Sequence, residues 1–307
     1  MRRRLVLAVL ALSAAAAVLW ATGMAGLAQA WIAMQGQRAE WQHKGLWLPH
    51  YRAAIDARQI EGLADNVSGL TYSAATGTLF TVTNRPPQVA ELSPGGRLLR
   101  SFPLQGARDP EGITHVEGNR FIIADEGRNR LSWVEIAPGT AALDLARAPH
   151  LTLDFAGQDN MGFEGISWDS AGHRLMLVQE MWPVRVLSVT GIEATLAGGG
   201  MALGIHEWAP SAGHAFLAAD LSSVTLHEPT GNLLLLSHMN AALYEYAPDS
   251  RVVSLLPLWA GWAGLAEDIP QAEGVAVGAA GEIYIVSEPN LFYRLDRQPA
   301  AAWAGDG

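Results

Sequence analysis

The sequence predicts an all-β protein, a five-bladed β-propeller with four-stranded blades. Five segments repeat one pattern, in which Glu or Ser is followed by a small residue, a short apolar strand, a turn and a second apolar strand. The segments are 68–84, 111–126, 164–180, 222–238 and 273–288. Their starts lie 43 to 58 residues apart, a period typical of propeller blades. After the N-terminal region, short β-rich runs alternate with Gly, Pro, Asn and Asp turns, and no useful helical periodicity appears.

Each repeat supplies the two inner strands of a blade, and further strands come after it. Third strands are expected at 89–92, 131–136, 184–189, 243–247 and 291–296, and fourth strands at 98–104, 151–155 and 252–258. Blade three has no evident fourth strand because 191–220 is Gly-rich and irregular, so a sixth blade there is the alternative to five. Blade five also lacks one, since the chain ends. We therefore expect the N-terminal strand at 51–57 to complete blade five, which closes the ring and leaves no free sheet edge.

Composition limits the partners. Half of the 307 residues are hydrophobic, and 30 acidic residues against 20 Lys and Arg give a net charge of −10. This charge argues against a nucleic-acid partner, which needs a basic face, and suits cations or neutral ligands. The chain has no cysteine, which excludes disulfides, thiolate catalysis and Cys-ligated zinc.

The N-terminus predicts export. Arg2, Arg3 and Arg4 precede a run that is uncharged from Leu5 through Gln37, so the N-terminus is expected to stay inside and the rest to be exported. Cleavage after Ala30 is one outcome, because Ala28-Gln29-Ala30 fits a cleavage site. A retained anchor is favoured, because the apolar run reaches the roughly 20 residues that span a bilayer.

These features divide the chain into four parts. We expect a signal or transmembrane helix at 1–30, a linker at 31–48, the propeller at 49–297 and a flexible tail at 298–307. The propeller would then lie in the periplasm or another extracytoplasmic space. A retained segment makes the protein a single-pass protein of the cell inner membrane, in contact with the membrane through that segment only, and cleavage makes it secreted.

The register of the repeat predicts two polar rings at one mouth of a central channel. The innermost strand begins, and its antiparallel neighbour ends, at the same end of the ring. The starts are Ser68, Glu111, Glu164, Ser222 and Glu273, and the ends are Asn84, Glu126, Glu180, His238 and Glu288. Both positions are therefore acidic in blades two, three and five.

Six carboxylates in one funnel need positive charge, because like charges held together raise one another's pKa. Arg85, Arg128 and Arg185 lie just after the second ring in the sequence and could neutralise some of them. The other solution is a hard divalent cation, and glutamates without Cys and with scarce His favour Ca²⁺ over zinc. The candidate metal ligands are Glu111, Glu164, Glu273, Glu126, Glu180 and Glu288.

Other interpretations stay open at these positions. A glutamate before Gly can be a solvated turn residue. His238 could be a ligand or a general base, but a structural hydrogen-bonded histidine is favoured. Asp65-Asn66 and Asp220 precede blades one and four, whose strands do not start with Glu. These residues either supply the ligand oxygens that those blades lack or cap turns. Asp109 introduces the turn that presents Glu111.

Three segments resemble a known family: DNVSGLTYSAATGTLFTVTNRPPQVAEL, DPEGITHVEGNRFIIADE and GFEGISWDSAGHRLMLVQE are similar to the SdiA-regulated family, the YjiK-like bacterial propeller proteins. The resemblance covers about 47–296 and implies a five-bladed propeller behind an N-terminal membrane segment, with a calcium site. It implies Glu111, Glu164 and Glu273 as leading ligands, and it names no substrate. The strand starts also look like those of gluconolactonase-like propellers, which are metal-dependent lactone hydrolases; this is fold-level analogy.

Three functions are compatible with these patterns. The favoured one is a calcium-binding, membrane-tethered propeller with an unknown small-molecule or protein ligand, since no nucleophile–base motif is present. The second is a metal-dependent hydrolase of a lactone or phosphoester, in which a cation polarises the scissile oxygen and a funnel glutamate or His238 is the base. The third is a structural propeller without a functional metal. No catalytic residue is assigned.

Overall fold

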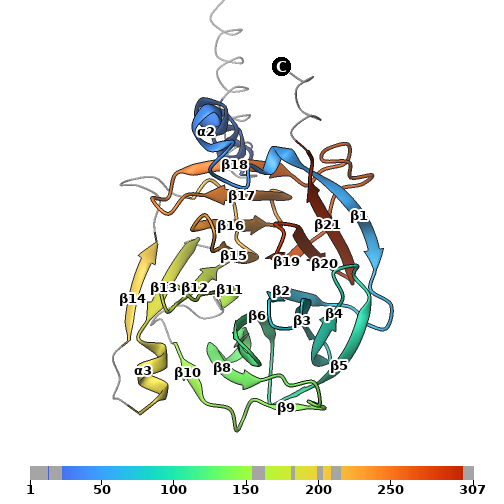
Figure 1. Cartoon of the computed structure of the whole chain (residues 1–307), viewed down its shortest axis with the longest axis vertical. Helices are drawn as coiled ribbons and strands as arrows, with labels where there is room; N and C mark the ends of the chain where they lie inside the picture. The colour runs from blue at the N-terminus through green and yellow to red at the C-terminus, as the bar shows by residue number, and fades with distance from the viewer. Residues whose placement is uncertain are drawn as a thin grey trace, which may run out of the picture.

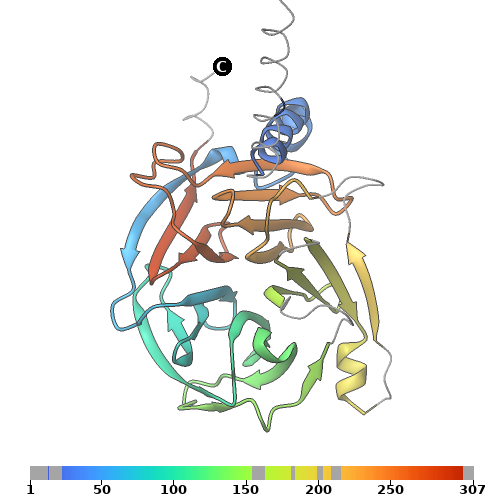
Figure 2. The same cartoon turned by 180° about the vertical axis from the view of Figure 1, so that it is seen from behind.

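Five sheets surround a common centre in the computed structural model, so the predicted five-bladed propeller with four-stranded blades is confirmed (Figures 1 and 2). The structure describes residue 13 and residues 23–153, 163–180, 184–198, 203–208 and 216–299. Within these residues the strands of each blade pair in antiparallel order from the centre outward, which orients every innermost strand in the same way.

The strands occur in the predicted order. Blade one contains β2 (Val67–Ser73), β3 (Thr78–Asn84), β4 (Pro87–Leu92) and β5 (Leu98–Gln105), and the short β9 (Leu143–Asp144) adds a parallel pair outside β5. Blade two contains β6 (Pro110–Glu117), β7 (Arg120–Asp125), β8 (Arg130–Glu135) and β10 (His150–Thr152). Blade three contains β11 (Phe163–Asp169), β12 (Arg174–Gln179), β13 (Arg185–Thr190) and β14 (Gly204–Trp208). Blade four contains β15 (Ser223–His227), β16 (Asn232–Ser237), β17 (Ala242–Tyr246) and β18 (Val252–Pro257). Blade five contains β19 (Ala272–Val277), β20 (Ile283–Ser287), β21 (Leu291–Arg297) and β1 (Tyr51–Gln59).

The N-terminal strand closes the ring, as expected. β1 pairs with β21 from Tyr51 opposite Arg297 to Gln59 opposite Leu291, and β1 lies outermost in blade five (Figure 1). The described part of the irregular stretch 191–220 supplies a short helix, α3 (Ile192–Leu196), and β14 as the fourth strand of blade three. That strand fills the place for which the sequence left a sixth blade open.

The hydrophobic core is divided among the interfaces between neighbouring blades. Phe80 and Val82 of blade one, for example, share a buried cluster with Ile113 and Phe121 of blade two. Because a blade is covered on both faces, its middle strands are continuous apolar runs; all six residues of β16 are buried. These interfaces hold the inner strands in a fixed arrangement around the centre.

Helix α2 (Met24–Trp41) packs on the outer edge of blade four (Figure 1). Its buried residues Leu27, Ala30 and Met34 join the cluster between blades three and four. Residues 31–41, in the stretch where the sequence suggested a linker, are therefore helical and packed.

The chain between α2 and β1, which includes the 3₁₀ turn η1 (Leu48–His50), is held by a buried carboxylate. Glu245 accepts hydrogen bonds from the backbone N–H groups of Leu46 (2.7 Å) and Trp47 (3.0 Å). It also accepts from Asn232 Nδ2 (2.7 Å) and Ser254 Oγ (2.6 Å). This segment is thereby fixed to blade four.

Most of the predicted signal or anchor segment, residues 1–12 and 14–22, lies outside the described residues, as do residues 300–307 of the predicted tail. No helix in the described part of the chain is both long and apolar enough to cross a bilayer.

Candidate functional site

A β-bulge at the start of three innermost strands places the site glutamates. The pairing of β6 with β7 passes from Pro110 opposite Asp125 to Gly112 opposite Ala124, which leaves Glu111 as the extra residue. The pairing of β19 with β20 likewise skips Glu273, and that of β11 with β12 passes from Phe163 opposite Gln179 to Ile166 opposite Leu177, an irregularity that contains Glu164 and Gly165. A bulge re-aims the side chain of its extra residue, so the same backbone irregularity turns all three carboxylates toward the centre.

The glycine after each of these glutamates is required by packing between neighbouring blades. A Cβ on Gly112 would lie 2.9 Å from the carbonyl oxygen of Glu164 in the next blade, and one on Gly165 would lie 2.7 Å from Ser223 Cα. A Cβ on Gly274 would lie 2.7 Å from the carbonyl carbon of Gly69. The glycines therefore let neighbouring inner strands approach closely, and the Glu-Gly pair combines a site residue with a packing residue.

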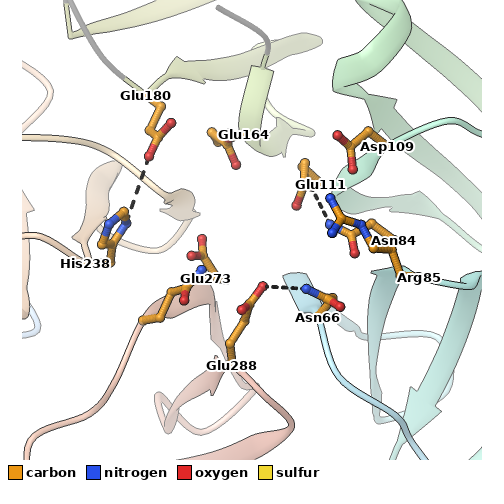
Figure 3. A pocket seen from close by; sticks show the side chains of 11 residues that line it. Asn66, Asn84, Arg85, Asp109, Glu111, Glu164, Glu180, His238, Glu273 and Glu288 are labelled. Carbon is orange, nitrogen blue, oxygen red and sulfur yellow. Dashed lines mark hydrogen bonds and ion pairs between the residues drawn. The ribbon is translucent and has the colours of Figure 1, made fainter. Parts of the chain in front are cut away.

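Five of the six predicted glutamates line one pocket of about 310 Å³ (Figure 3). The lining residues are Glu111, Glu164, Glu180, Glu273, Glu288, Asn66, Asn84, Arg85, Asp109, Gln271 and His238. The sixth, Glu126, is not in this lining; it begins the 3₁₀ turn η2 (Glu126–Arg128). Carboxylate oxygens of Glu126, Asp109 and Glu111 nevertheless lie within 4.8 Å of one another. The register argument thus brought five of its six glutamates to one pocket.

The serines that start blades one and four do not reach the pocket. Ser68 Oγ donates to the carbonyl oxygen of Glu111 at 3.0 Å, and Ser222 Oγ donates to that of Ala272 at 2.7 Å. Both serines are buried and tie their blade to the next one. Asn66, which precedes blade one, does line the pocket, and its Nδ2 donates to Glu288 Oε1 at 3.3 Å; its neighbour Asp65 is exposed and is not part of the lining.

Asn84 carries an oxygen with no protein partner. Its Nδ2 donates to Glu111 Oε1 at 2.9 Å, and its buried Oδ1 has no hydrogen-bond partner. Leaving a buried carbonyl oxygen unpaired costs about 1–3 kcal/mol. Asn84 lines the same pocket as the glutamates, and an unpaired amide oxygen is a suitable ligand for a hard cation.

Burial raises the pKa values of the inner carboxyls. It raises the pKa of Glu111 to about 7 and that of Glu273 to about 8. Burial, together with the neighbouring carboxylates, raises the pKa of Glu164 well above its usual range, and burial also raises that of Glu180. Protons or another cation are therefore needed to offset the negative charge of these carboxylates.

His238 forms an ion pair at one side of the pocket. Its Nδ1 lies 2.9 Å from Asp220 Oδ2 and 4.0 Å from Glu180 Oε1, although it makes no regular hydrogen bond. Asp220 is fully buried and also accepts from the backbone N–H groups of His238 and Met239, both at 3.2 Å, and from Ser237 Oγ. Asp220 raises the pKa of His238 to about 9. His238 is thus an imidazolium at neutral pH, which fits the structural role better than that of a metal ligand.

Of the three arginines expected near the funnel, only Arg85 lines the pocket among the described residues. Arg128 lies 3.4 Å from Asp125 and donates to the carbonyl oxygen of Gly106. Arg185 lies 3.9 Å from Glu207 on β14. Arg128 and Arg185, two of the candidates for neutralising the funnel, thus each lie beside another acid, Arg128 from the turn η2 and Arg185 from β13. The acidic lining faces two basic residues, Arg85 and His238.

A profile of the SdiA-regulated family matches residues 43–296, which include all five blades. The chain belongs to the SdiA-regulated family. The resemblance carried by the motifs of the first three blades is thereby confirmed.

Three solved structures of other proteins are similar to this chain. Glutaminyl cyclase of Myxococcus xanthus matches with a TM-score of 0.53 and 15% identity, over 81% of this chain and 97% of that one. A luciferin-regenerating enzyme matches with a TM-score of 0.49 and 12% identity, over 78% and 94%. A streptogramin B lyase matches with a TM-score of 0.41 and 11% identity, over 76% of this chain and 65% of that one. At such identities the first likeness shows the propeller fold alone, and the weaker two carry no argument.

Proposed function

We propose that this SdiA-regulated propeller is a membrane-tethered, extracytoplasmic protein that binds Ca²⁺ at its acidic pocket and holds a small-molecule or protein ligand there. One observation carries the proposal. The half-buried Glu111 and Glu164 and the buried Glu273 come from three different blades and line a single pocket together with Asn84, whose buried Oδ1 has no protein partner. Burying several carboxylates together is costly without a compensating cation.

The donor set fits Ca²⁺. All of the candidate ligands are carboxylate or amide oxygens, which Ca²⁺ binds in sets of six to eight together with water. Glu111, Glu164 and Glu273 would hold the ion, and Asn84 and Glu288 lie in the same lining. Zinc would favour a neutral histidine, whereas Asp220 raises the pKa of His238 to about 9 and so favours its charged form.

The tether rests on the sequence. Arg2, Arg3 and Arg4 precede a long uncharged segment, an order that favours export of the downstream chain. Helix α2, which packs on blade four, starts at Met24, soon after this segment. An anchored chain would therefore keep the propeller next to the membrane, whereas cleavage after Ala30 would cut α2 within the part that packs on blade four.

Isothermal titration of the full chain in detergent with Ca²⁺ tests the metal site. We expect measurable binding, and we expect Glu164→Gln to weaken it by at least about tenfold, or about 1.4 kcal/mol. The matched control is Glu61→Gln, because Glu61 is exposed in a turn outside the pocket. Absence of binding heat, together with a melting temperature that EDTA leaves unchanged, would show that the pocket holds no Ca²⁺.

A metal-dependent hydrolase of a lactone or phosphoester is the second candidate. The His238–Asp220 pair beside Glu180 favours it, because a histidine held by a buried aspartate can exchange a proton with a substrate. A bound cation would supply polarisation of the scissile oxygen. The wild-type protein should then hydrolyse a member of a panel of lactones and phosphodiesters. A protein that binds Ca²⁺ but hydrolyses none of them would contradict the hydrolase proposal and leave the Ca²⁺ site standing.

A further inference from the structure

A group of aromatic and aliphatic side chains is exposed near the start of α2. Ile32 is 72% exposed, Trp262 41% and Met24 37%. Trp262 lies edge-on between two other indoles, with ring centroids 5.6 Å from Trp31 and 6.3 Å from Trp259. We name these five residues, from α2 and the loop after β18, the tryptophan patch. Two distant segments of the chain thus form one apolar surface at the edge of blade four.

The packing of α2 on blade four leaves the tryptophan patch facing outward. Leu27, Ala30 and Met34 face blade four, where Met34 Sδ accepts a hydrogen bond from the backbone N–H of Leu255 at 3.3 Å. Trp259 Nε1 donates to the carbonyl oxygen of Asn240 at 3.2 Å, which fixes that indole. The opposite face of the helix, at 24, 25, 28, 29 and 32, is exposed. The surface is therefore held rigidly in place and has no cover among the described residues.

Charge is distributed unevenly along α2. No charged residue occurs from 24 to 37, and the charges begin at Arg38. At that end Arg251 lies 3.6 Å from Glu40 and 5.5 Å from the Trp41 ring, and Lys44 lies 5.9 Å from the same ring. The helix thus passes from an apolar beginning to a charged end, as expected for a helix that leaves a lipid interface for water.

The chain before α2 indicates what covers the patch. Residues 5–23 are uncharged and come directly after three arginines, and about 20 such residues can cross a bilayer. If this segment is the anchor, the start of α2 lies at the bilayer surface. Tryptophan is enriched at that depth because its ring is apolar while its N–H can bond to water or headgroups.

We propose that the tryptophan patch docks against the lipid surface and orients the propeller on the membrane. This docking rests on the tether of the proposed function. Gly23 and Gly26 pack against Ala219 and Leu217, just before Asp220. The docked edge therefore adjoins the blade that carries Asp220 and His238, and docking sets the height and angle of the acidic pocket above the bilayer. Because the patch has no basic residue, it inserts into zwitterionic lipid.

Site-directed spin labelling tests the docking, because a chain without cysteine takes a single label wherever one cysteine is introduced. The variants are Ile32→Cys and Ala25→Cys on the exposed face of α2. The matched control is Leu99→Cys, on β5 of blade one. Leu99 is 46% exposed, and blade one is not a neighbour of blade four in the ring. Each full-length variant is reconstituted in phosphatidylcholine vesicles, floated on a density gradient and measured for collision with oxygen and with a water-soluble nickel chelate.

We expect the protein to float with the vesicles and the labels at 25 and 32 to show an oxygen-to-nickel accessibility ratio severalfold above that at 99. If the protein floats but the accessibility ratio at positions 25 and 32 equals that at position 99, the docking is overturned and the tether stands. Labels shielded from both reagents would overturn it in favour of a second copy of the chain on the patch. Protein that fails to float would overturn the tether and the docking together.

Discussion

Asp220 is a buried carboxylate whose partners are all close in the sequence. It is fully buried, accepts from the backbone N–H groups of His238 and Met239, and pairs with the His238 ring. Asn240 extends this network, because its Oδ1 accepts from the backbone N–H of Ala219 at 2.8 Å. The turn between β16 and β17 is therefore held by two polar side chains, and it carries His238 into the pocket. From the sequence, Asp220 either supplied a metal-ligand oxygen to blade four or capped a turn. In the structure its main role is to hold His238.

Replacing Asp220 by Ala should lower the free energy of unfolding by about 3 kcal/mol, because two backbone donors lose a partner at about 1–3 kcal/mol each. Urea denaturation of the full chain measures this. Asp65→Ala is the control, since Asp65 is exposed and precedes blade one as Asp220 precedes blade four. Equal losses in the two variants would show that the network around Asp220 does not stabilise the fold.

The inner strand is the element that joins fold and site. Where the strand starts with Glu-Gly, its bulge presents the glutamate and its glycine admits the next blade. In blades one, two and three, a hydroxyl three residues after the start also binds the next blade. Thr71 Oγ1 accepts from the backbone N–H of His115 at 3.1 Å, Thr114 Oγ1 from that of Trp168 at 2.9 Å, and Ser167 Oγ from that of Leu226 at 2.9 Å. The hydroxyls at this position are visible in the aligned repeats and could have predicted which blades contact one another.

Gly165→Ala should destabilise the protein by about 1–3 kcal/mol, the usual range for overpacking. The new Cβ would lie 2.7 Å from both Ser223 Cα and the backbone N of Val224, so the inner strands of blades three and four must move apart. Gly139→Ala is the matched control, because nothing lies within 4 Å of its Cβ position. Chemical denaturation compares the two, and a Gly165→Ala protein as stable as the control would contradict the close approach of the strands.

At the scale of the whole molecule, the acidic pocket makes stability depend on pH. The folded protein raises the pKa of Glu111 to about 7 and of Glu273 to about 8, from an ordinary value near 4.5. Between those values the folded state binds more protons than the unfolded state, so stability falls as pH rises through this window. His238, with its pKa raised to about 9, adds stability below pH 6.5 that is lost as pH rises through 9.

The melting temperature in EDTA should therefore fall from pH 5 to pH 8.5. Ca²⁺ should raise it more at pH 8 than at pH 5, because the cation competes with protons for the same carboxylates. Glu273→Gln should flatten the metal-free profile, since it removes the group with the pKa near 8. Differential scanning calorimetry of the full chain measures both series, and a metal-free melting temperature that rises with pH would contradict the assignment of protons to these glutamates.

The sequence alone favoured five blades over six, and it predicted the strand that closes the ring and the end of the ring where the polar residues gather. Repetition makes this possible, because a register read in one blade applies to the next, and antiparallel pairing places strand starts and ends together. It also determined five residues of the pocket lining, Glu111, Glu164, Glu180, Glu273 and Glu288.

Only the tertiary structure decided how each polar side chain is used. Ser68 and Ser222 turn to the next blade, Asn84 keeps a free oxygen, and His238 is held by Asp220. It also decided that α2, which covers the end of the expected signal or transmembrane segment and the start of the expected linker, packs on blade four. Periodicity specifies the face and the end of a strand, but the distances between atoms of different blades decide which of those atoms bind one another.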